Sequence, residues 1–106
     1  MTSDQGFELH PGAASDITGI WEFIVEDNPD AAGRVREDIL DRIRKLVPFP
    51  RQGHQRTDLT SRPLRFRTVR NYLIGYAPDE RPLLIIAVLH GRRSPRVIEA
   101  ILRGRK

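Results

Sequence analysis

The chain contains no cysteine among its 106 residues. This absence excludes disulfide bonds and thiolate metal sites, so stability must come from packing alone. No run approaches the roughly 18 apolar residues that a membrane-spanning helix needs. The first seven residues are polar and acidic, unlike a secretory signal. We therefore expect a cytoplasmic protein with no membrane partner.

Motifs for metal, cofactor or covalent chemistry are also missing. The three histidines, at positions 10, 54 and 90, have no spacing that would gather metal ligands. The sequence has no glycine-rich phosphate loop and no serine nucleophile elbow. We therefore expect no metal and no cofactor, and we exclude nucleotide-dependent chemistry and serine hydrolysis.

The charge that is present is unevenly distributed. Residues 1–50 hold 5 Lys/Arg against 10 Asp/Glu, a balance of −5, and residues 51–106 hold 13 against 4, a balance of +9. Such an asymmetry steers encounters with acidic partners or with nucleic acid. A basic half that only aids solubility is the alternative.

Hydrophobic spacing predicts the N-terminal elements. Phe7–His10 alternates apolar and polar residues, as a short strand does. Apolar residues at i, i+3/i+4 spacing predict a helix from Ala13 that stops before Asn28. Asn28 then caps a second helix, which has Pro29 in its first turn and ends at Pro48. Two such helices joined by a short turn pack as an antiparallel hairpin.

The C-terminal half reads as a loop, three strands and a short helix. Residues 48–63 form a proline-rich loop, and residues 64–68 alternate between apolar residues and arginine or threonine. Tyr72–Ala77 is the next strand, and Leu83–Leu89 is a continuous apolar run typical of a strand buried on both faces. Ser94 caps a last helix, which has Val97, Ile98, Ile101 and Leu102 facing inward.

This order predicts one α+β domain over residues 1–106. It consists of an N-terminal strand, an antiparallel helical hairpin packed on an antiparallel β-sheet with a three-strand C-terminal meander, and a short terminal helix. We expect the hairpin to cover one face of the sheet. We expect the other face, bearing Arg65 and Arg67, to be open to solvent or a partner.

A basic rim on this sheet carries the candidate chemistry. Its members are Arg65, Arg67, Arg70, His90, Arg92 and Arg93, with Tyr72 and Tyr76 nearby. Arginines hold phosphates bidentately, and a histidine can move protons near neutral pH. Together they could cut RNA without a metal by activating a 2′-hydroxyl. The structural alternative is that His90 hydrogen-bonds its own turn and that the tyrosines pack in the sheet.

Two aromatic residues of the first helix are candidates for partner binding. Trp21 and Phe23 lie on adjacent flanks, so at most one can be fully buried. We expect Trp21 to pack in the core, and the exposed aromatic residue to anchor a partner.

The chain resembles the ParE branch of the RelE/ParE superfamily of type II toxin-antitoxin toxins. The resemblance covers nearly the whole chain, through Asp16, Ile17, Ile20 and Trp21, Asn28-Pro29, Pro50 and Gly53, Arg56-Thr57-Asp58-Leu59, Leu64-Arg65, Tyr72-Leu73-Ile74-Gly75-Tyr76 and Val88-Leu89-His90-Gly91-Arg92-Arg93. It implies a toxin that inhibits DNA gyrase, blocks replication and growth, and contributes to plasmid stabilisation. By this analogy the target-binding residues are Arg65, Arg67, His90, Arg92, Arg93 and Arg96.

The resemblance also implies a small acidic antitoxin, ParD-like or similar, in a hetero-oligomeric complex. We expect it to contact Trp21, Phe23, Arg56, Arg65 and Tyr72.

The RelE branch offers an alternative, a ribosome-dependent mRNA endonuclease using Arg65, Arg67, Tyr76, His90 and Arg92. That branch typically has an arginine where this chain has Leu73. It also has a catalytic tyrosine or histidine where this chain has residues 97–100. A non-toxic module that only binds its antitoxin is a further alternative.

Overall fold

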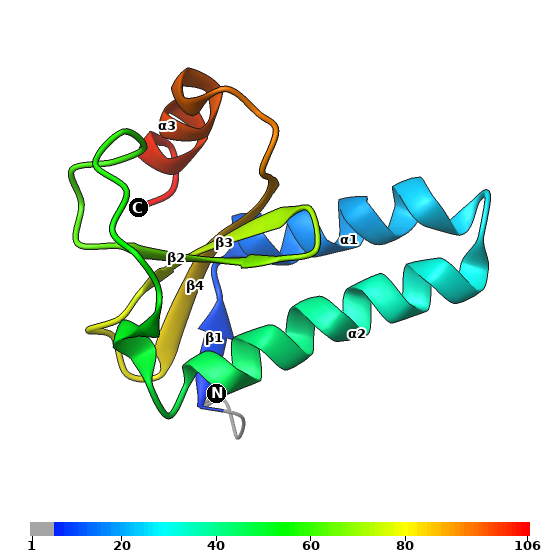
Figure 1. Ribbon diagram of the computed structural model, residues 1–106, viewed down its shortest axis with the longest axis horizontal. Coiled ribbons are helices and arrows are strands. Elements are labelled where there is room, and N and C mark those ends of the chain that lie inside the picture. Colours follow the sequence, from blue (N-terminus) through cyan, green and yellow to red (C-terminus); the bar gives the residue numbers. More distant parts are fainter. Residues whose placement is uncertain (1–5) are drawn as a thin grey trace.

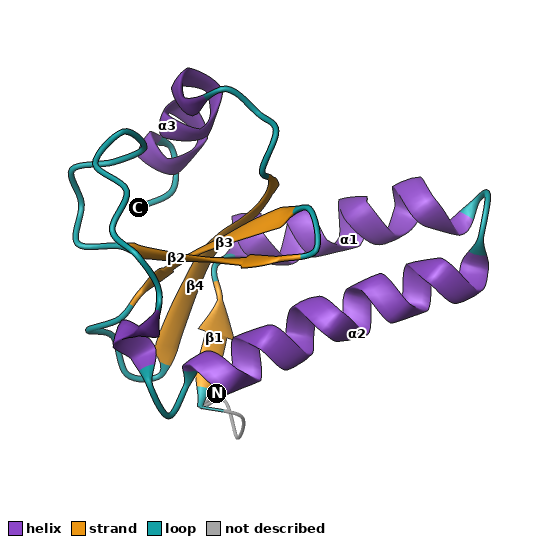
Figure 2. Cartoon of the chain, viewed as in Figure 1, coloured by secondary structure: helices purple, strands orange, loops and turns teal. Residues whose placement is uncertain are grey.

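The computed structural model describes residues 6–106. Figure 1 shows its elements in chain order, and Figure 2 colours them by type. Their bounds are β1 Phe7–Leu9, α1 Pro11–Val25, α2 Pro29–Leu46, η1 Pro50–Gln52, β2 Arg65–Val69, β3 Tyr72–Ala77, β4 Leu83–His90 and α3 Pro95–Arg103. The predicted α+β order is confirmed, with one 3-10 turn, η1, added inside the long loop. Within residues 6–106, none of the helices has both the length and the apolar character that crossing a membrane needs.

The four strands form one sheet in the order β1-β4-β3-β2. The last three make the predicted antiparallel meander. β1 pairs in parallel with β4, so the sheet is mixed rather than antiparallel throughout. β4 has β3 on one side and, beside residues 83–85, β1 on the other, and the two faces of the apolar run Leu83–Leu89 are both covered. Its side chains are buried except for Leu84, which is partly buried.

α1 begins at Pro11, two residues before the predicted start at Ala13. The imidazole Nδ1 of His10 accepts the backbone N–H of Gly12 at 2.9 Å and so caps the helix. Pro11 fits the first helical position because no N–H is needed there. The Pro11-Gly12 pair therefore starts a helix as well as ending a strand.

The helical hairpin extends beyond the end of the sheet (Figure 1). Asn28 Oδ1 accepts the N–H of Ala31 and caps α2, with Pro29 next, as predicted. Trp21 is 38% exposed and Phe23 is 83% exposed. The prediction that Trp21 packs in the core is wrong, because α1 turns Ile17, Ile20 and Ile24 toward the core and Trp21 lies about 100° around the helix from Ile20.

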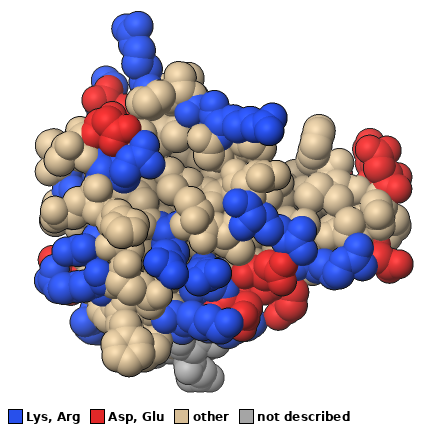
Figure 3. Space-filling view, viewed as in Figure 1, with Lys and Arg blue, Asp and Glu red and all other residues tan. Residues whose placement is uncertain are grey.

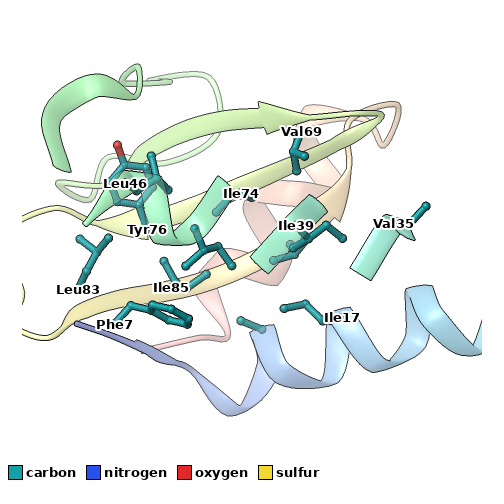
Figure 4. Close-up of a cluster of buried hydrophobic side chains, with 13 residues drawn as sticks. Phe7, Ile17, Val35, Ile39, Leu46, Val69, Ile74, Tyr76, Leu83 and Ile85 are labelled. Atoms are coloured by element: carbon teal, nitrogen blue, oxygen red, sulfur yellow. The ribbon is translucent and has the colours of Figure 1, made fainter. Parts of the chain in front are cut away.

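The main core lies between the hairpin and the sheet (Figure 4). Side chains from both helices meet side chains from β2, β3 and β4 there. Figure 4 labels Ile17 of α1, Val35, Ile39 and Leu46 of α2, and Val69, Ile74, Tyr76, Leu83 and Ile85 of the strands. Burial of this apolar surface holds the hairpin on the sheet.

A second core covers the opposite face of the sheet. Leu59 of the long loop and Ile98 and Leu102 of α3 pack there against Phe66 and Ile86. The long loop is thus partly a structural segment, since Leu59 is completely buried. The expectation of an open second face is wrong, because α3 and the loop cover it.

The arginines of β2 lie on the helical side of the sheet. Val69 packs in the main core, whereas Phe66 packs in the second core. Because side chains alternate along a strand, Arg65 and Arg67 share the face of Val69. The prediction that they project from the face opposite the helices is therefore wrong. The alternation of side chains along β2 was visible in the sequence. The sequence did not show which of the two faces the helical hairpin would cover.

Two local expectations also change. The strand expected over residues 64–68 is shifted by one residue, so Val69 ends β2 and the turn follows at Arg70, whose φ is 52°. In α3, Ile98 and Leu102 are buried as predicted, but Val97 is 45% exposed. Consecutive residues are about 100° apart around a helix. Because Ile98 faces the sheet, Val97 points away from it.

Candidate functional site

A groove of about 510 Å³ lies between α1 and the end of the sheet where β3 begins and β4 ends. Its apolar lining comes mainly from Ile20, Phe23 and Ile24 of α1 and from Tyr72. His90 and Arg93 contribute its basic groups. The remaining lining residues are Ser15, Asp16, Gly19, Val88 and Leu89. The groove thus joins an apolar surface to positive charge.

One wall of the groove includes an edge of β4 that no described strand covers. β1 pairs only with residues 83–85 of β4, although β4 continues to His90. Asp16 Oδ2 accepts the N–H of Val88 at 2.9 Å, and Arg105 Nη1 donates to the carbonyl of Ile86 at 3.2 Å. These side chains replace the missing strand at two positions. The edge beyond them, through Leu89 to His90, lies along the groove.

His90 is held in its turn by its own ring. Nδ1 accepts the backbone N–H of Arg92 at 3.1 Å, and the ring meets the edge of the Tyr72 ring with centroids 5.6 Å apart. This confirms the structural interpretation of His90. Because Nδ1 is the acceptor, a neutral His90 carries its proton on Nε2. One N–H donor therefore remains for a partner.

The basic residues of the C-terminal half fall into three groups. Of its 13 Lys/Arg, five pair with carboxylates: Arg51, Arg56, Arg70, Arg103 and Arg105. Three donate to backbone carbonyls: Arg62, Arg65 and Arg81. The side chains of the other five form no ion pair or hydrogen bond within residues 6–106: Arg67, Arg92, Arg93, Arg96 and Lys106.

Figure 3 shows Lys and Arg spread over this face, several of them beside Asp or Glu. The single continuous rim expected from the sequence is therefore wrong. Of its five arginines, Arg70 pairs with Asp38 and Arg65 binds backbone carbonyls. The side chains of Arg67, Arg92 and Arg93 do neither within residues 6–106.

The residues considered for RNA cleavage do not converge. Arg65 stands opposite Tyr76 in the sheet, and His90 stands opposite Tyr72, four residues along β3. At about 3.3 Å per residue, the two places are about 13 Å apart along the strand. Only His90 and Arg92 of that set are neighbours in one turn.

Tyr76 and Arg65 instead fasten the long loop at Gly53. The buried Tyr76 hydroxyl accepts the N–H of Gly53 at 2.9 Å, and Arg65 Nη1 donates to the Gly53 carbonyl at 2.8 Å. Burial raises the pKa of the Tyr76 phenol, outweighing the opposing effects of this N–H and of the nearby arginines. A Cβ at position 53 would lie 2.8 Å from the Phe66 carbonyl oxygen, so glycine is needed there.

The five proposed antitoxin-contacting residues lie in several places. Phe23 and Tyr72 line the groove, whereas Trp21, also on α1, does not. Arg56 pairs with a carboxylate of its own loop, and that hydrogen bond raises its pKa. Arg65 is bound to the loop backbone. The structure therefore brings only Phe23 and Tyr72 of this set together in the groove.

Sequence reasoning missed the role of Asp16 and Arg105. Asp16 was named only as part of the family resemblance, and Arg105 was not singled out. Their side chains are only 14% and 17% exposed and pair bidentately, with Arg105 Nη2 2.9 Å from Asp16 Oδ1. The available signal was the length mismatch between the short first strand and the seven-residue apolar run. That mismatch leaves backbone groups needing partners.

The sequence and the fold are similar to those of known proteins. Residues 7–95 match the family described as "ParE toxin of type II toxin-antitoxin system, parDE". Toxin ParE2 of Mycobacterium tuberculosis, strains CDC 1551 / Oshkosh and ATCC 25618 / H37Rv, is 25% identical over 97 residues, covering 92% of this chain and 91% of the relative. The solved structure "Chromosomal ParDE TA system from P. aeruginosa" has the same fold, with a TM-score of 0.69 and 19% identity over 85% of this chain and 96% of its own. Because the family match spans most of the sequence, the chain belongs to the ParE toxin family of type II toxin-antitoxin systems.

Proposed function

We propose that this protein inhibits DNA gyrase and thereby blocks replication, and that a cognate antitoxin neutralises it by binding in the groove. Family membership supports the general role. The observation that carries the antitoxin site is the combination of an exposed aromatic residue, an open strand edge and uncompensated positive charge in one groove.

The groove fits an extended, acidic segment of a small antitoxin. Phe23, 83% exposed, offers an apolar anchor that costs free energy when left in water. The edge of β4 up to His90 can pair with an added strand. Arg93 and the free N–H of His90 can bind a carboxylate. A ParD-like antitoxin with these features would form a hetero-oligomer with this chain.

Gyrase is favoured over messenger RNA as the target of the toxin, because the residues considered for RNA cleavage are dispersed. Tyr76 is buried and engaged with Gly53, and Arg65 is bound to the same loop. Neither group is free to act at a scissile phosphate beside His90. This favours a poison of a DNA-cleaving enzyme, without catalysis by the toxin itself.

The test uses purified toxin with purified gyrase. We expect loss of supercoiling and a rise in the amount of cleaved DNA at micromolar toxin, both reversed by an equimolar amount of the antitoxin from the adjacent gene. Unchanged supercoiling together with unchanged cleavage would reject the gyrase proposal.

Two parallel measurements separate the alternatives. Toeprinting on translating ribosomes that reveals cuts in the A-site codon would identify a RelE-like endonuclease. Expression that leaves growth unaffected, combined with tight antitoxin binding, would identify a non-toxic binding module.

A further inference from the structure

We propose that Arg92, Arg93 and Arg96 form a contact surface for the phosphate backbone of duplex DNA. The inference rests on the proposed function in one respect, because the DNA in question is the segment that gyrase holds. The DNA contact itself can be measured without gyrase. The surface is called the 92–96 patch below.

The patch concentrates positive charge that nothing in residues 6–106 neutralises. Its three arginines are exposed, and they make up three of the five unpartnered basic residues of the C-terminal half. The nearest carboxylate in sequence, Glu99, already pairs with Arg103 at 3.1 Å. Three uncompensated charges thus fall within five consecutive residues, and their fields add in attracting an anionic partner.

The backbone that carries these side chains is held in place. Gly91 donates its N–H to the carbonyl of Asn71 at 2.8 Å, and Arg93 donates its N–H to the carbonyl of His90 at 3.1 Å. Ser94 Oγ accepts the N–H of Val97 and caps α3. Because the backbone is already fixed, DNA binding would cost conformational entropy in the arginine side chains and little in the backbone.

Phosphate is the partner chemistry that this patch fits best. A protein interface needs an apolar centre. Val97, 45% exposed, is the only large exposed apolar side chain of α3. The planar fork of arginine binds phosphate oxygens bidentately. Each strand of duplex DNA carries one phosphate per about 3.4 Å of helix axis, so three arginines can each find one.

The patch adjoins the groove through Arg93, which belongs to both. A carboxylate of the antitoxin on Arg93 and a DNA phosphate on Arg93 exclude one another. Neutralisation would therefore include displacement of the DNA, which links the two surfaces in one mechanism.

The experiment measures fluorescence anisotropy of a labelled 20-base-pair duplex over a series of salt concentrations. For three phosphate contacts, the slope of log K against log salt is expected near −2.7, from about −0.9 per contact. In R92Q/R93Q/R96Q we expect most of this slope to vanish and affinity at low salt to fall by at least about tenfold.

The matched control is R34Q/R36Q/R42Q on α2. It removes the same charge from arginines whose side chains also form no ion pair or hydrogen bond within residues 6–106. We expect this control to keep the wild-type slope. Equal losses in both triple variants would mean that net charge alone drives binding, and would overturn the proposal. Undetectable duplex binding by the wild-type chain, or a tenfold preference for single-stranded RNA, would overturn it as well.

The gyrase arm separates this inference from the proposed function. A wild-type protein that binds duplex through the 92–96 patch but leaves gyrase unaffected would support the contact surface and reject gyrase as the target. A gyrase poison whose potency is the same in R92Q/R93Q/R96Q as in wild type would support the target and overturn the contact surface. Thermal unfolding of each variant verifies that the substitutions leave the fold intact.

Discussion

Asp16 of α1 and Arg105 of the C-terminal segment, 89 positions apart, form a bidentate ion pair beside the uncovered edge of β4. Both side chains also bind that edge, through the N–H of Val88 and the carbonyl of Ile86. The pair therefore supplies the hydrogen bonds that β1 would supply if it extended further along β4. It also ties the segment after α3 to the first helix.

Removing Arg105 should destabilise the fold strongly. Arg105→Leu leaves a largely buried Asp16 carboxylate without its partner, and we expect the free energy of unfolding to fall by about 2 to 3 kcal/mol. Urea unfolding monitored by Trp21 fluorescence measures this. The control is Arg103→Leu, which breaks an exposed pair, 72% and 54% exposed, and should cost less than about 1 kcal/mol. Similar small losses in both variants would contradict the structural role of the Asp16–Arg105 pair.

Tyr76→Phe should lower stability and alter its dependence on alkaline pH. The Gly53 N–H loses its acceptor, which costs about 1 to 2 kcal/mol at neutral pH. Because the folded pKa of Tyr76 is raised, the unfolded chain loses the phenolic proton first, near pH 10. The wild-type stability from this group is therefore present below that pH and lost as pH rises through the folded pKa.

Urea unfolding at pH 9, 10 and 11 compares wild type with Tyr76→Phe. The loss above pH 10 should be smaller in the variant, which has no phenol at this position. Tyr72 stays in both proteins as the internal reference. Parallel curves for the two proteins would show that Tyr76 does not carry the effect.

Phe23→Ala should weaken antitoxin binding without weakening the fold. The side chain is 83% exposed, so its removal should change the free energy of unfolding by less than about 0.5 kcal/mol. Buried under the antitoxin, the same side chain should contribute about 2 kcal/mol, or roughly thirtyfold in Kd by calorimetry. Phe49→Ala is the matched control, since Phe49 is 71% exposed and lies outside the groove. If the two variants bind equally well, the groove is not the antitoxin site.

Arg65 and Arg67 should differ although they lie on the same face of β2. Arg65→Ala removes hydrogen bonds to the carbonyls of Gly53 and Arg51 and should cost about 1 to 2 kcal/mol. Arg67→Ala breaks no ion pair or hydrogen bond described in residues 6–106 and should cost less than about 0.5 kcal/mol. Differential scanning calorimetry compares the two melting temperatures, and a larger loss for Arg67 would contradict this assignment.

The secondary structure could be predicted largely from local patterns. Asn28 and Ser94 cap their helices as expected, because capping involves groups three residues apart. The run Leu83–Leu89 has both faces buried as predicted, because continuous apolar residues need cover on both faces. The exception is the start of α1, which was predicted at Ala13 but lies at Pro11. The Pro11-Gly12 dipeptide suits both the end of a strand and the start of a helix.

The candidate site was predicted less completely. Phe23, Tyr72, His90 and Arg93 were all named from the sequence, and the structure brings them into one groove. Arg65 and Tyr76 were named for function, yet both fasten the loop at Gly53. Residue type and spacing indicate what a side chain can do, whereas its neighbours decide which of its hydrogen bonds are already made.

The sequence alone determined the order of strands and helices, the helix caps, the uneven charge and the family resemblance. Each of these depends on composition or on residues that are close together in the chain. The tertiary structure decided which face of the sheet the hairpin covers, and it brought Asp16 to Arg105. It also decided which arginines stay free of carboxylates and carbonyls. The physical reason is that ion pairs and burial depend on distances in space between segments that are remote in sequence, and local periodicity does not contain those distances.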